Sequence, residues 1–325
     1  MRLIVMGTGP FAIPMFDALL TSPHEVITVV TRPTRVTPGR RPPKNPMRDQ
    51  SLATHIPVLE PDNVNHPNSI ETLRSLAPDL FVVCDFGQIL STELLNCASL
   101  GGVNLHGSLL PRHRGASPVQ WALLKGDPIT GISVIHMTPS LDAGAVITAN
   151  ATPIGHKETA VSLEQRLSLM GAEAVLEAID RLQAARCSGL LQHGQSFGLP
   201  QDASQATRAP RLSKSDGIID WSLSATSIER MRRALEPWPR TATMFRHAHK
   251  AKRLVIEDCA VLDTDLNANQ KPPGTVLRAD ESGIAVACGE NSVLSILRVI
   301  PEGKRSMLAG DFLRGNTIHT DSVLG

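Results

Sequence analysis

Three polar residues near the middle of the chain have the types and the spacing that acyl transfer requires. Asn104 and His106 stand two positions apart, so on a strand their side chains share one face. An amide can donate hydrogen bonds to a developing oxyanion, and an imidazole can carry a proton. Asp142, two residues before Gly144, can orient the imidazole or simply hydrogen-bond its own turn. We interpret these residues as a candidate catalytic set for acyl transfer without a covalent intermediate.

A short loop follows His106 and strengthens this interpretation. It reads Gly-Ser-Leu-Leu-Pro over residues 107–111 and continues to Gly115. A lone histidine is generally a packing or surface residue, and the chain contains 11 of them. Functional residues, however, gather where strands end and loops begin. The combination of amide, imidazole and bounded loop therefore favours a site over ordinary packing.

Apolar runs alternate with helical patterns and predict the sheet that must position this set. A continuous apolar run at Leu3–Met6 is typical of a buried parallel strand, and further strands are predicted at Val26–Val30, Leu80–Cys84 and Gly102–His106. Ile132–Met137 alternates like a half-exposed strand. The predicted fold class is α/β, with a Rossmann-like doubly wound sheet in the N-terminal domain.

A glycine pattern at residues 7–12 follows the first predicted strand. Gly-Thr-Gly-Pro-Phe-Ala matches the dinucleotide fingerprint, which also requires an acid at the end of the second strand to hold a ribose. That strand ends at Thr31-Arg32-Pro33, with no acid. We therefore interpret the glycines as a structural turn and expect no nicotinamide cofactor.

The domain organisation follows from a change of pattern along the chain. Ser162 and Gln165 have the capping-box spacing and predict the start of the last helix of the first domain. We predict a catalytic domain at 1–186, a linker at 187–208 and a second domain at 209–325. Short apolar runs predict that the second domain is a small β-barrel. They are Arg253–Ile256, Gly274–Leu277, Gly283–Ala287 and Ser292–Leu297.

Composition narrows the class of protein. A chain of 325 residues exceeds one ordinary domain, and its net charge of +1 gives no evidence about a nucleic-acid partner. The five cysteines form no C-x-x-C pair, so we expect neither a zinc site nor a disulfide framework. We find no signal peptide at residues 1–7 and no apolar run of about 18 residues, and we expect a cytoplasmic protein.

The motifs resemble those of the folate-dependent formyltransferases. That family carries Asn-x-His before a Ser-Leu-Leu-Pro loop and a later Leu-Asp-x-Gly, which match residues 104–111 and 141–144. Further segments resemble the second domain of the methionyl-tRNA formyltransferases, a barrel of the oligonucleotide-binding (OB) kind. They are Ala209–Trp221, Pro237-Trp238-Pro239, Gly274–Val276 and Pro301–Met307.

The resemblance implies the reaction and the roles of several residues. The enzyme would transfer the formyl group of 10-formyltetrahydrofolate to the α-amino group of initiator methionyl-tRNA, for translation initiation, with Asn104, His106 and Asp142 as catalytic residues and without a metal. The expected folate-binding residues are Phe86, Gly87, Gln88, Ile89, Leu90, Ser108, Leu109, Leu110 and Pro111. Cys84-Asp85-Phe86 departs from the family, where an apolar pair and Tyr are usual, and Asp85 brings a charge near the pocket.

Two basic segments are candidates for contacts with tRNA. Residues 32–48 contain six Lys and Arg before the first acid, and Gly39-Arg40 aligns with a family loop that enters the tRNA acceptor end. We predict that Arg40, Arg41 and Lys44 bind tRNA, although a solvated irregular loop is an alternative. Residues 211–254 hold ten Lys and Arg against four Asp and Glu, an excess expected for a phosphate-binding surface or a solvated charged face.

Other functions remain open on the sequence alone. A sugar-nucleotide formyltransferase uses the same Asn-His-Asp set, but the basic segment at 32–48 and Pro237-Trp238-Pro239 argue against it. A glycinamide ribonucleotide formyltransferase would leave residues 209–325 unexplained, and a formyltetrahydrofolate dehydrogenase needs a further large domain. A non-catalytic tRNA-binding protein would not need the three polar residues. We expect a monomer that binds folate and tRNA and no membrane.

Overall fold

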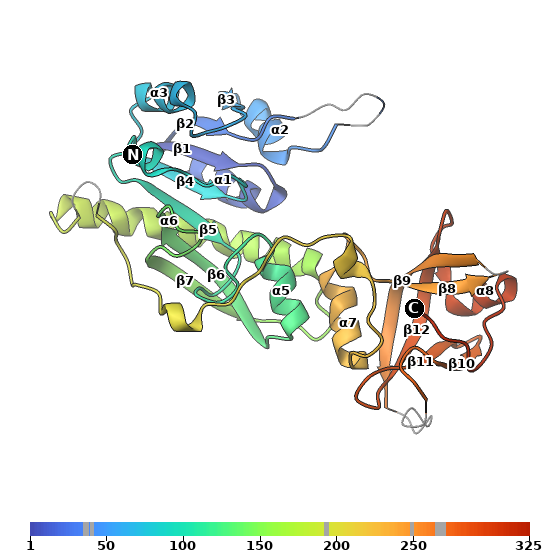
Figure 1. The fold of residues 1–325 in the computed structure, drawn as a ribbon. Helices are drawn as coiled ribbons and strands as arrows, with labels where there is room; N and C mark the ends of the chain where they lie inside the picture. The colour runs from blue at the N-terminus through green and yellow to red at the C-terminus, as the bar shows by residue number, and fades with distance from the viewer. Residues whose placement is uncertain (35–38, 40–41, 192–194, 248–249, 264–270) are drawn as a thin grey trace. The chain divides into compact units, whose positions relative to one another are not determined.

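The chain forms two compact units, which are described separately. A computed structural model describes residues 1–325 except 35–38, 40–41, 192–194, 248–249 and 264–270 (Figure 1). The first unit comprises Met1–Val119, Pro128–Ile154 and Ser162–Arg211, and the second Gln120–Asp127, Gly155–Val161 and Leu212–Gly325. Two short segments inside the predicted catalytic domain thus belong to the C-terminal unit. None of the described helices is long and apolar enough to cross a bilayer.

A seven-stranded mixed sheet forms the centre of the first unit. Its strands are β1 (Arg2–Gly7), β2 (Glu25–Val30), β3 (Val58–Leu59), β4 (Leu80–Cys84), β5 (Gly102–His106), β6 (Ile129–His136) and β7 (Val146–Pro153). The order is β3-β2-β1-β4-β5-β6-β7, parallel through β5 and antiparallel at β6 and β7. This confirms the predicted Rossmann-like sheet. The carboxyl ends of β1, β4 and β5 meet at one edge, where α/β proteins place their ligands.

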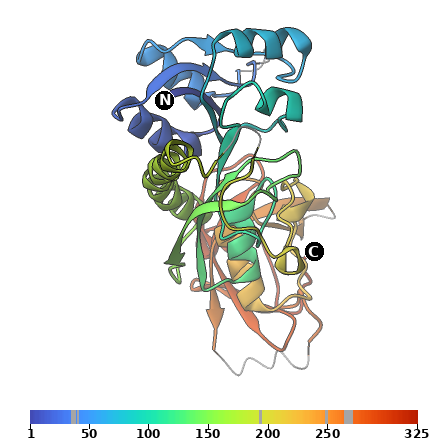
Figure 2. The same ribbon diagram turned by 90° about the vertical axis from the view of Figure 1, so that its left-hand side faces the viewer.

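Helices pack on this sheet and bury its apolar strands. They are α1 (Ile13–Leu20), α2 (Pro46–Ala53), α3 (Pro67–Ser75), α4 (Thr92–Leu95) and α6 (Ala160–Cys187), with a 3₁₀ turn at Pro10–Ala12, whereas most of α5 (Pro118–Lys125) belongs to the second unit. Phe16 and Phe81 are fully buried, each contributing roughly 1.5–3 kcal/mol. The long helix α6 lies against the sheet (Figures 1 and 2). Gly171 permits this packing, because a Cβ there would lie 2.5 Å from Leu105 Cδ2.

Two sequence predictions about this unit were wrong in detail. The strand predicted as half-exposed is β6, and seven of its eight residues are buried, because β5 and β7 pair with both of its edges and helices cover the sheet. Ser162 does not cap α6, which already begins at Ala160. The capping-box spacing therefore falls inside the first turn of the helix.

An antiparallel sheet and two helices form most of the second unit. Its strands are β8 (Ala242–His247), β9 (Lys250–Leu262), β10 (Val276–Asp280), β11 (Gly283–Ala287), β12 (Val293–Pro301) and β13 (Met307–Leu308). Its helices are α7 (Ala225–Ala234) and α8 (Ala309–Gly315), and 3₁₀ turns lie at Ala203–Gln205 in the first unit and Ser215–Gly217 in the second. The order β10-β11-β12-β9-β8, with β13 beside β12, gives a curled half-barrel consistent with the predicted OB-like domain.

Candidate active site

Strand β5 carries the first two residues of the predicted catalytic set to the edge of the sheet. Asn104 pairs with Val83 of β4 and Ile135 of β6, and His106 is the last residue of the strand. Their two-residue spacing places both side chains on one face. Asn104 is partly exposed, and no other described residue hydrogen-bonds its side chain. Its amide is therefore available to an incoming carbonyl oxygen.

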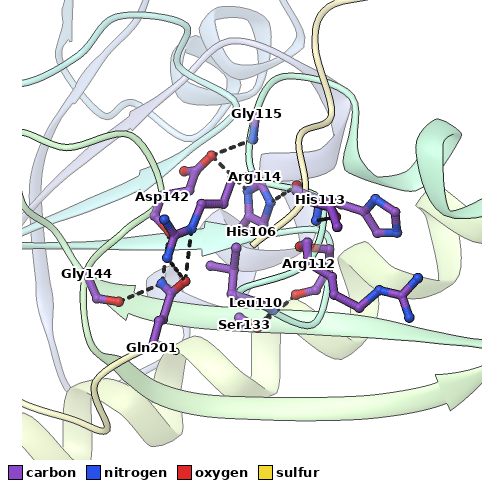
Figure 3. A network of polar contacts seen from close by, with 12 residues as sticks. His106, Leu110, Arg112, His113, Arg114, Gly115, Ser133, Asp142, Gly144 and Gln201 are labelled. Carbon is purple, nitrogen blue, oxygen red and sulfur yellow. Dashed lines mark hydrogen bonds and ion pairs between the residues drawn. The ribbon is translucent and has the colours of Figure 1, made fainter. Parts of the chain in front are cut away.

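His106 is buried and oriented by a backbone carbonyl. Its Nε2 lies 2.9 Å from the carbonyl oxygen of His113, and only 5% of the residue is exposed. A carbonyl can only accept, so Nε2 carries a proton and the neutral ring has its lone pair on Nδ1. Nδ1 faces Asp142, whose Oδ2 lies 3.8 Å away (Figure 3). The structure therefore brings the imidazole and the carboxylate together on the same side of the sheet.

Asp142 is held in a tight turn after β6. Its backbone has a φ of 49°, in the left-handed region that non-glycine residues rarely adopt. Its Oδ2 accepts a hydrogen bond of 2.8 Å from the backbone N–H of Gly115. Gly144 lets the turn approach β6, since a Cβ there would lie 1.8 Å from the carbonyl oxygen of His136. The carboxylate is thus fixed by the loop that also follows His106.

The loop at residues 107–111 is anchored by two serines. Ser108 Oγ donates to the carbonyl of Arg112 at 2.6 Å. Ser133 on β6 donates to the carbonyl of Ser108 at 2.8 Å and accepts from the backbone N–H of Leu110 at 3.0 Å. Ser133 was not among the predicted site residues, and it is buried in a strand whose residues are mostly apolar. A hydroxyl in such a strand was the only signal available. Leu109, Leu110 and Pro111 remain partly exposed beside the site.

The predicted folate-binding segment at residues 86–90 contains both buried and exposed residues. Phe86 and Leu90 are buried in the apolar core below the sheet edge. Gln88 directs its Oε1 to the backbone N–H of Val64 at 2.9 Å, whereas Gly87 and Ile89 are exposed. Only part of this segment therefore faces solvent, and the rest packs.

Asp85 explains one of the glycines in the N-terminal pattern. Asp85 follows β4 with a φ of 48°, and a Cβ at Gly9 would lie 1.7 Å from Asp85 Oδ2. Although Asp85 stays exposed, the protein atoms packed around it raise the pKa of its carboxyl by desolvation, while Arg211 and Arg32 oppose the shift. Gly9 thus makes room for a carboxylate, at a position where a dinucleotide fingerprint would hold a phosphate.

Only some of the basic residues predicted to bind tRNA lie within the described part of the structure. Arg40 and Arg41 lie outside the described residues, and Lys44 is exposed. In the second basic segment, Arg233 is buried and bonds Glu229 at 2.7 Å, so it cannot contribute to a phosphate-binding surface. Five members are exposed: Arg211, Lys214, Arg240, Arg246 and Lys250.

Comparison with known proteins places this chain among the formyl transferases. Residues 1–179 match the family described as formyl transferase, and residues 211–317 match the formyl transferase C-terminal domain. The fold agrees with a sugar 3N-formyl transferase solved in the presence of dTDP and 5-N-formyl-THF, with a TM-score of 0.64 and 14% identity over 94% of this chain and 99% of that one. It also agrees with HypX from Aquifex aeolicus in complex with tetrahydrofolic acid, with a TM-score of 0.58 and 15% identity over 96% of this chain and 46% of that one.

Full-length relatives narrow the class to one family. The methionyl-tRNA formyltransferase of Rhodopirellula baltica is 41% identical, covering 98% of this chain and 95% of the relative. The methionyl-tRNA formyltransferase of Desulfotalea psychrophila is 38% identical, covering 100% of this chain and 95% of the relative. The chain belongs to the methionyl-tRNA formyltransferase family.

Proposed function

We propose that this chain transfers the formyl group of 10-formyltetrahydrofolate to the α-amino group of initiator methionyl-tRNA. The approach of His106 to Asp142, beside the free amide of Asn104, carries the proposal. It occurs in a chain that is similar to methionyl-tRNA formyltransferases over nearly its whole length. The sugar formyltransferases share the fold at far lower identity.

The geometry supports direct attack of the amine on the formyl carbon. As the new C–N bond forms, the carbonyl oxygen becomes an oxyanion, to which Asn104 donates a hydrogen bond. The Nε2–H of His106 donates a hydrogen bond to the carbonyl of His113, so Nδ1 is the atom that accepts the proton lost by the amine. The resulting imidazolium is stabilised by the Asp142 carboxylate, and its Nδ1–H is the proton passed on in the next step. Collapse breaks the bond to N10, which receives the proton, and no covalent enzyme intermediate forms.

The substrates are assigned to two surfaces. The folate is proposed to lie against Ser108, Leu109, Leu110 and Pro111 and the exposed part of residues 86–90. The tRNA is proposed to contact Arg40, Arg41 and Lys44, and the exposed basic residues of 211–254. Residues 1–186 and 209–325 remain the proposed catalytic and tRNA-binding domains, and we propose a cytoplasmic monomer.

A formyl-transfer assay with purified protein tests the function. We expect formylation of methionyl-initiator tRNA with 10-formyltetrahydrofolate, and at least a hundredfold lower kcat/KM with a dTDP-linked amino sugar as acceptor. Formylation of the amino sugar alone would replace the proposal with a sugar formyltransferase. Binding of tRNA without transfer to either acceptor would indicate a non-catalytic tRNA-binding protein.

A further inference from the structure

The segment predicted as a linker is hydrogen-bonded along the active-site loop. The backbone N–H of Arg114 donates to the carbonyl of Thr207 at 2.8 Å, and Ala209 N–H donates to the carbonyl of Arg114 at 2.7 Å. Leu199 exchanges two backbone hydrogen bonds of 2.8 Å with Val146 at the start of β7. Residues 199–209 therefore connect the loop after His106 to the strand that follows Asp142.

Gln201 lies at the centre of this segment and uses its whole amide group. Its Nε2 donates to the carbonyl of Asp142 at 2.9 Å and to the carbonyl of Gly144 at 2.7 Å. Its Oε1 accepts from Arg114, at 3.1 Å from Nε and 2.6 Å from Nη2 (Figure 3). Two donors and one acceptor on one planar group match a glutamine and no other uncharged side chain of this length.

These contacts close a ring around Asp142. From its carbonyl the ring runs through Gln201 and the Arg114 side chain to the peptide of Gly115, whose N–H returns to Asp142 Oδ2. Asp142 is thus held at its backbone and at its carboxylate by the same loop. This is the residue whose φ of 49° requires support from its surroundings.

We propose that Gln201 is a positioning residue, which sets the Asp142 carboxylate against His106 by fixing the backbone of residues 142–144 to Arg114. The inference rests on the proposed function, in which Asp142 stabilises the protonated imidazole. Without Gln201 the turn is free to relax from its left-handed conformation, and Oδ2 moves away from Nδ1. A displacement of about 1 Å in a catalytic group can cost up to a hundredfold in rate.

Replacement of Gln201 by Glu separates positioning from packing. Glu keeps the size and forms an ion pair with Arg114, but it presents oxygen atoms to the carbonyls of Asp142 and Gly144 in place of two donors. We expect Gln201→Glu and Gln201→Ala both to lower kcat by about tenfold to a hundredfold with KM values within threefold. Gln205→Ala is the matched control, because exposed Gln205 in the same segment bonds only Asp202 among described residues.

A double-mutant cycle tests whether Gln201 acts through Asp142. In an Asp142→Asn background, Gln201→Ala should reduce kcat by less than threefold further, since the carboxylate is already absent. Multiplicative losses in the double variant, or a kcat of Gln201→Glu equal to that of the wild type, would overturn the proposal. Where Gln201→Ala does not fold, Gln201→Glu and Arg114→Lys, which loses the planar fork, take its place in the cycle.

A measurement that does not depend on activity distinguishes failure of this inference from failure of the proposed function. Hydrogen exchange at the backbone N–H of Gly115, which donates to Asp142, should accelerate at least tenfold in Gln201→Glu and stay unchanged in Gln205→Ala. Unchanged exchange would contradict the positioning role even in an active enzyme. Absence of formyl transfer by the wild type, with accelerated exchange in the variant, would contradict only the function.

Discussion

At the scale of single residues, the active site depends on how one imidazole is held. His106 donates Nε2–H to a backbone carbonyl, which fixes both its tautomer and its ring orientation. The carboxylate of Asp142 lies 3.8 Å from Nδ1, longer than a hydrogen bond and too short for a water between them. A small movement on substrate binding would convert this approach into a charge-assisted hydrogen bond once Nδ1 is protonated. The observed geometry therefore needs only a small movement and protonation of Nδ1 to reach the proposed catalytic arrangement.

Removing either polar partner of the reaction should slow chemistry without unfolding the protein. Asn104→Ala deletes the oxyanion donor, and we expect kcat to fall by about a hundredfold to a thousandfold. Asp142→Asn keeps an oxygen to accept from Gly115 but loses the charge that stabilises the imidazolium, so a similar loss is expected. Single-turnover formyl transfer and thermal unfolding measure the two quantities. Wild-type rates in both variants would exclude the proposed chemistry.

The proposed catalytic residues were easier to predict from the sequence than the residues that position them. Asn104 and His106 follow from strand periodicity, and Asp142 needed the family motif in addition. Gln201 and Arg114 could not be predicted, because their roles arise from the pairing of segments 87 residues apart in the chain. Polar residues in an irregular segment give no periodic signal, so the sequence alone favours a linker there.

At the scale of elements, β6 connects the active site to the segment after α6 through a second buried histidine. His136, at the end of β6, donates from Nε2 to the carbonyl of Leu100 at 3.0 Å and accepts at Nδ1 from the backbone N–H of Phe197 at 2.8 Å. Both ring nitrogens are satisfied only in the neutral form. Burial lowers the pKa of His136 below its usual value, outweighing the carbonyl of Leu100.

The neutral His136 should make the first unit less stable in mild acid. The unfolded chain takes up a proton on this residue as the pH falls below about 6.5, whereas the folded chain does not until its lowered pKa is reached. The free energy of unfolding therefore decreases in this window by up to about 1.4 kcal/mol per pH unit. Urea unfolding at several pH values, compared with His136→Gln, checks the slope. The variant should depend less on pH between 7 and 5, and equal slopes would contradict the assignment.

Strands were predicted well where nearly all their residues are buried, and poorly where tertiary contacts determine which residues are buried. Strands β4 and β5 were predicted with their observed bounds, since β4 is a continuous apolar run and four of the five residues of β5 are buried. The burial of β6 was misjudged, because its polar residues Ser133 and His136 bond inside the protein instead of facing solvent. A period of two cannot distinguish these alternatives.

At the scale of the whole molecule, the two units are not consecutive stretches of sequence. Trp121 and Leu124 of α5 pack against the core of the C-terminal unit, and a Cβ at Gly126 would lie 2.2 Å from the Arg230 guanidinium. Arg233 donates to the carbonyl of Glu158 at 3.0 Å. The core of the C-terminal unit is therefore completed by residues that precede α6. No helix was predicted at α5, and contacts between segments far apart in the chain leave no local pattern in the sequence.

Separating the chain at residue 208 should consequently yield two pieces that need each other. Fragment 209–325 lacks Trp121 and Leu124, and fragment 1–208 exposes them to solvent. We expect both fragments to bind a hydrophobic dye when alone, and to co-purify with native circular dichroism when mixed, since Trp121 and Leu124 are partly buried against this core and full burial of side chains of this size contributes roughly 1.5–3 kcal/mol each. Trp121→Asp with Leu124→Asp in fragment 1–208 is the control that should abolish co-purification. Independent folding of fragment 209–325, with the melting temperature of the intact chain, would show that α5 contributes nothing to its core.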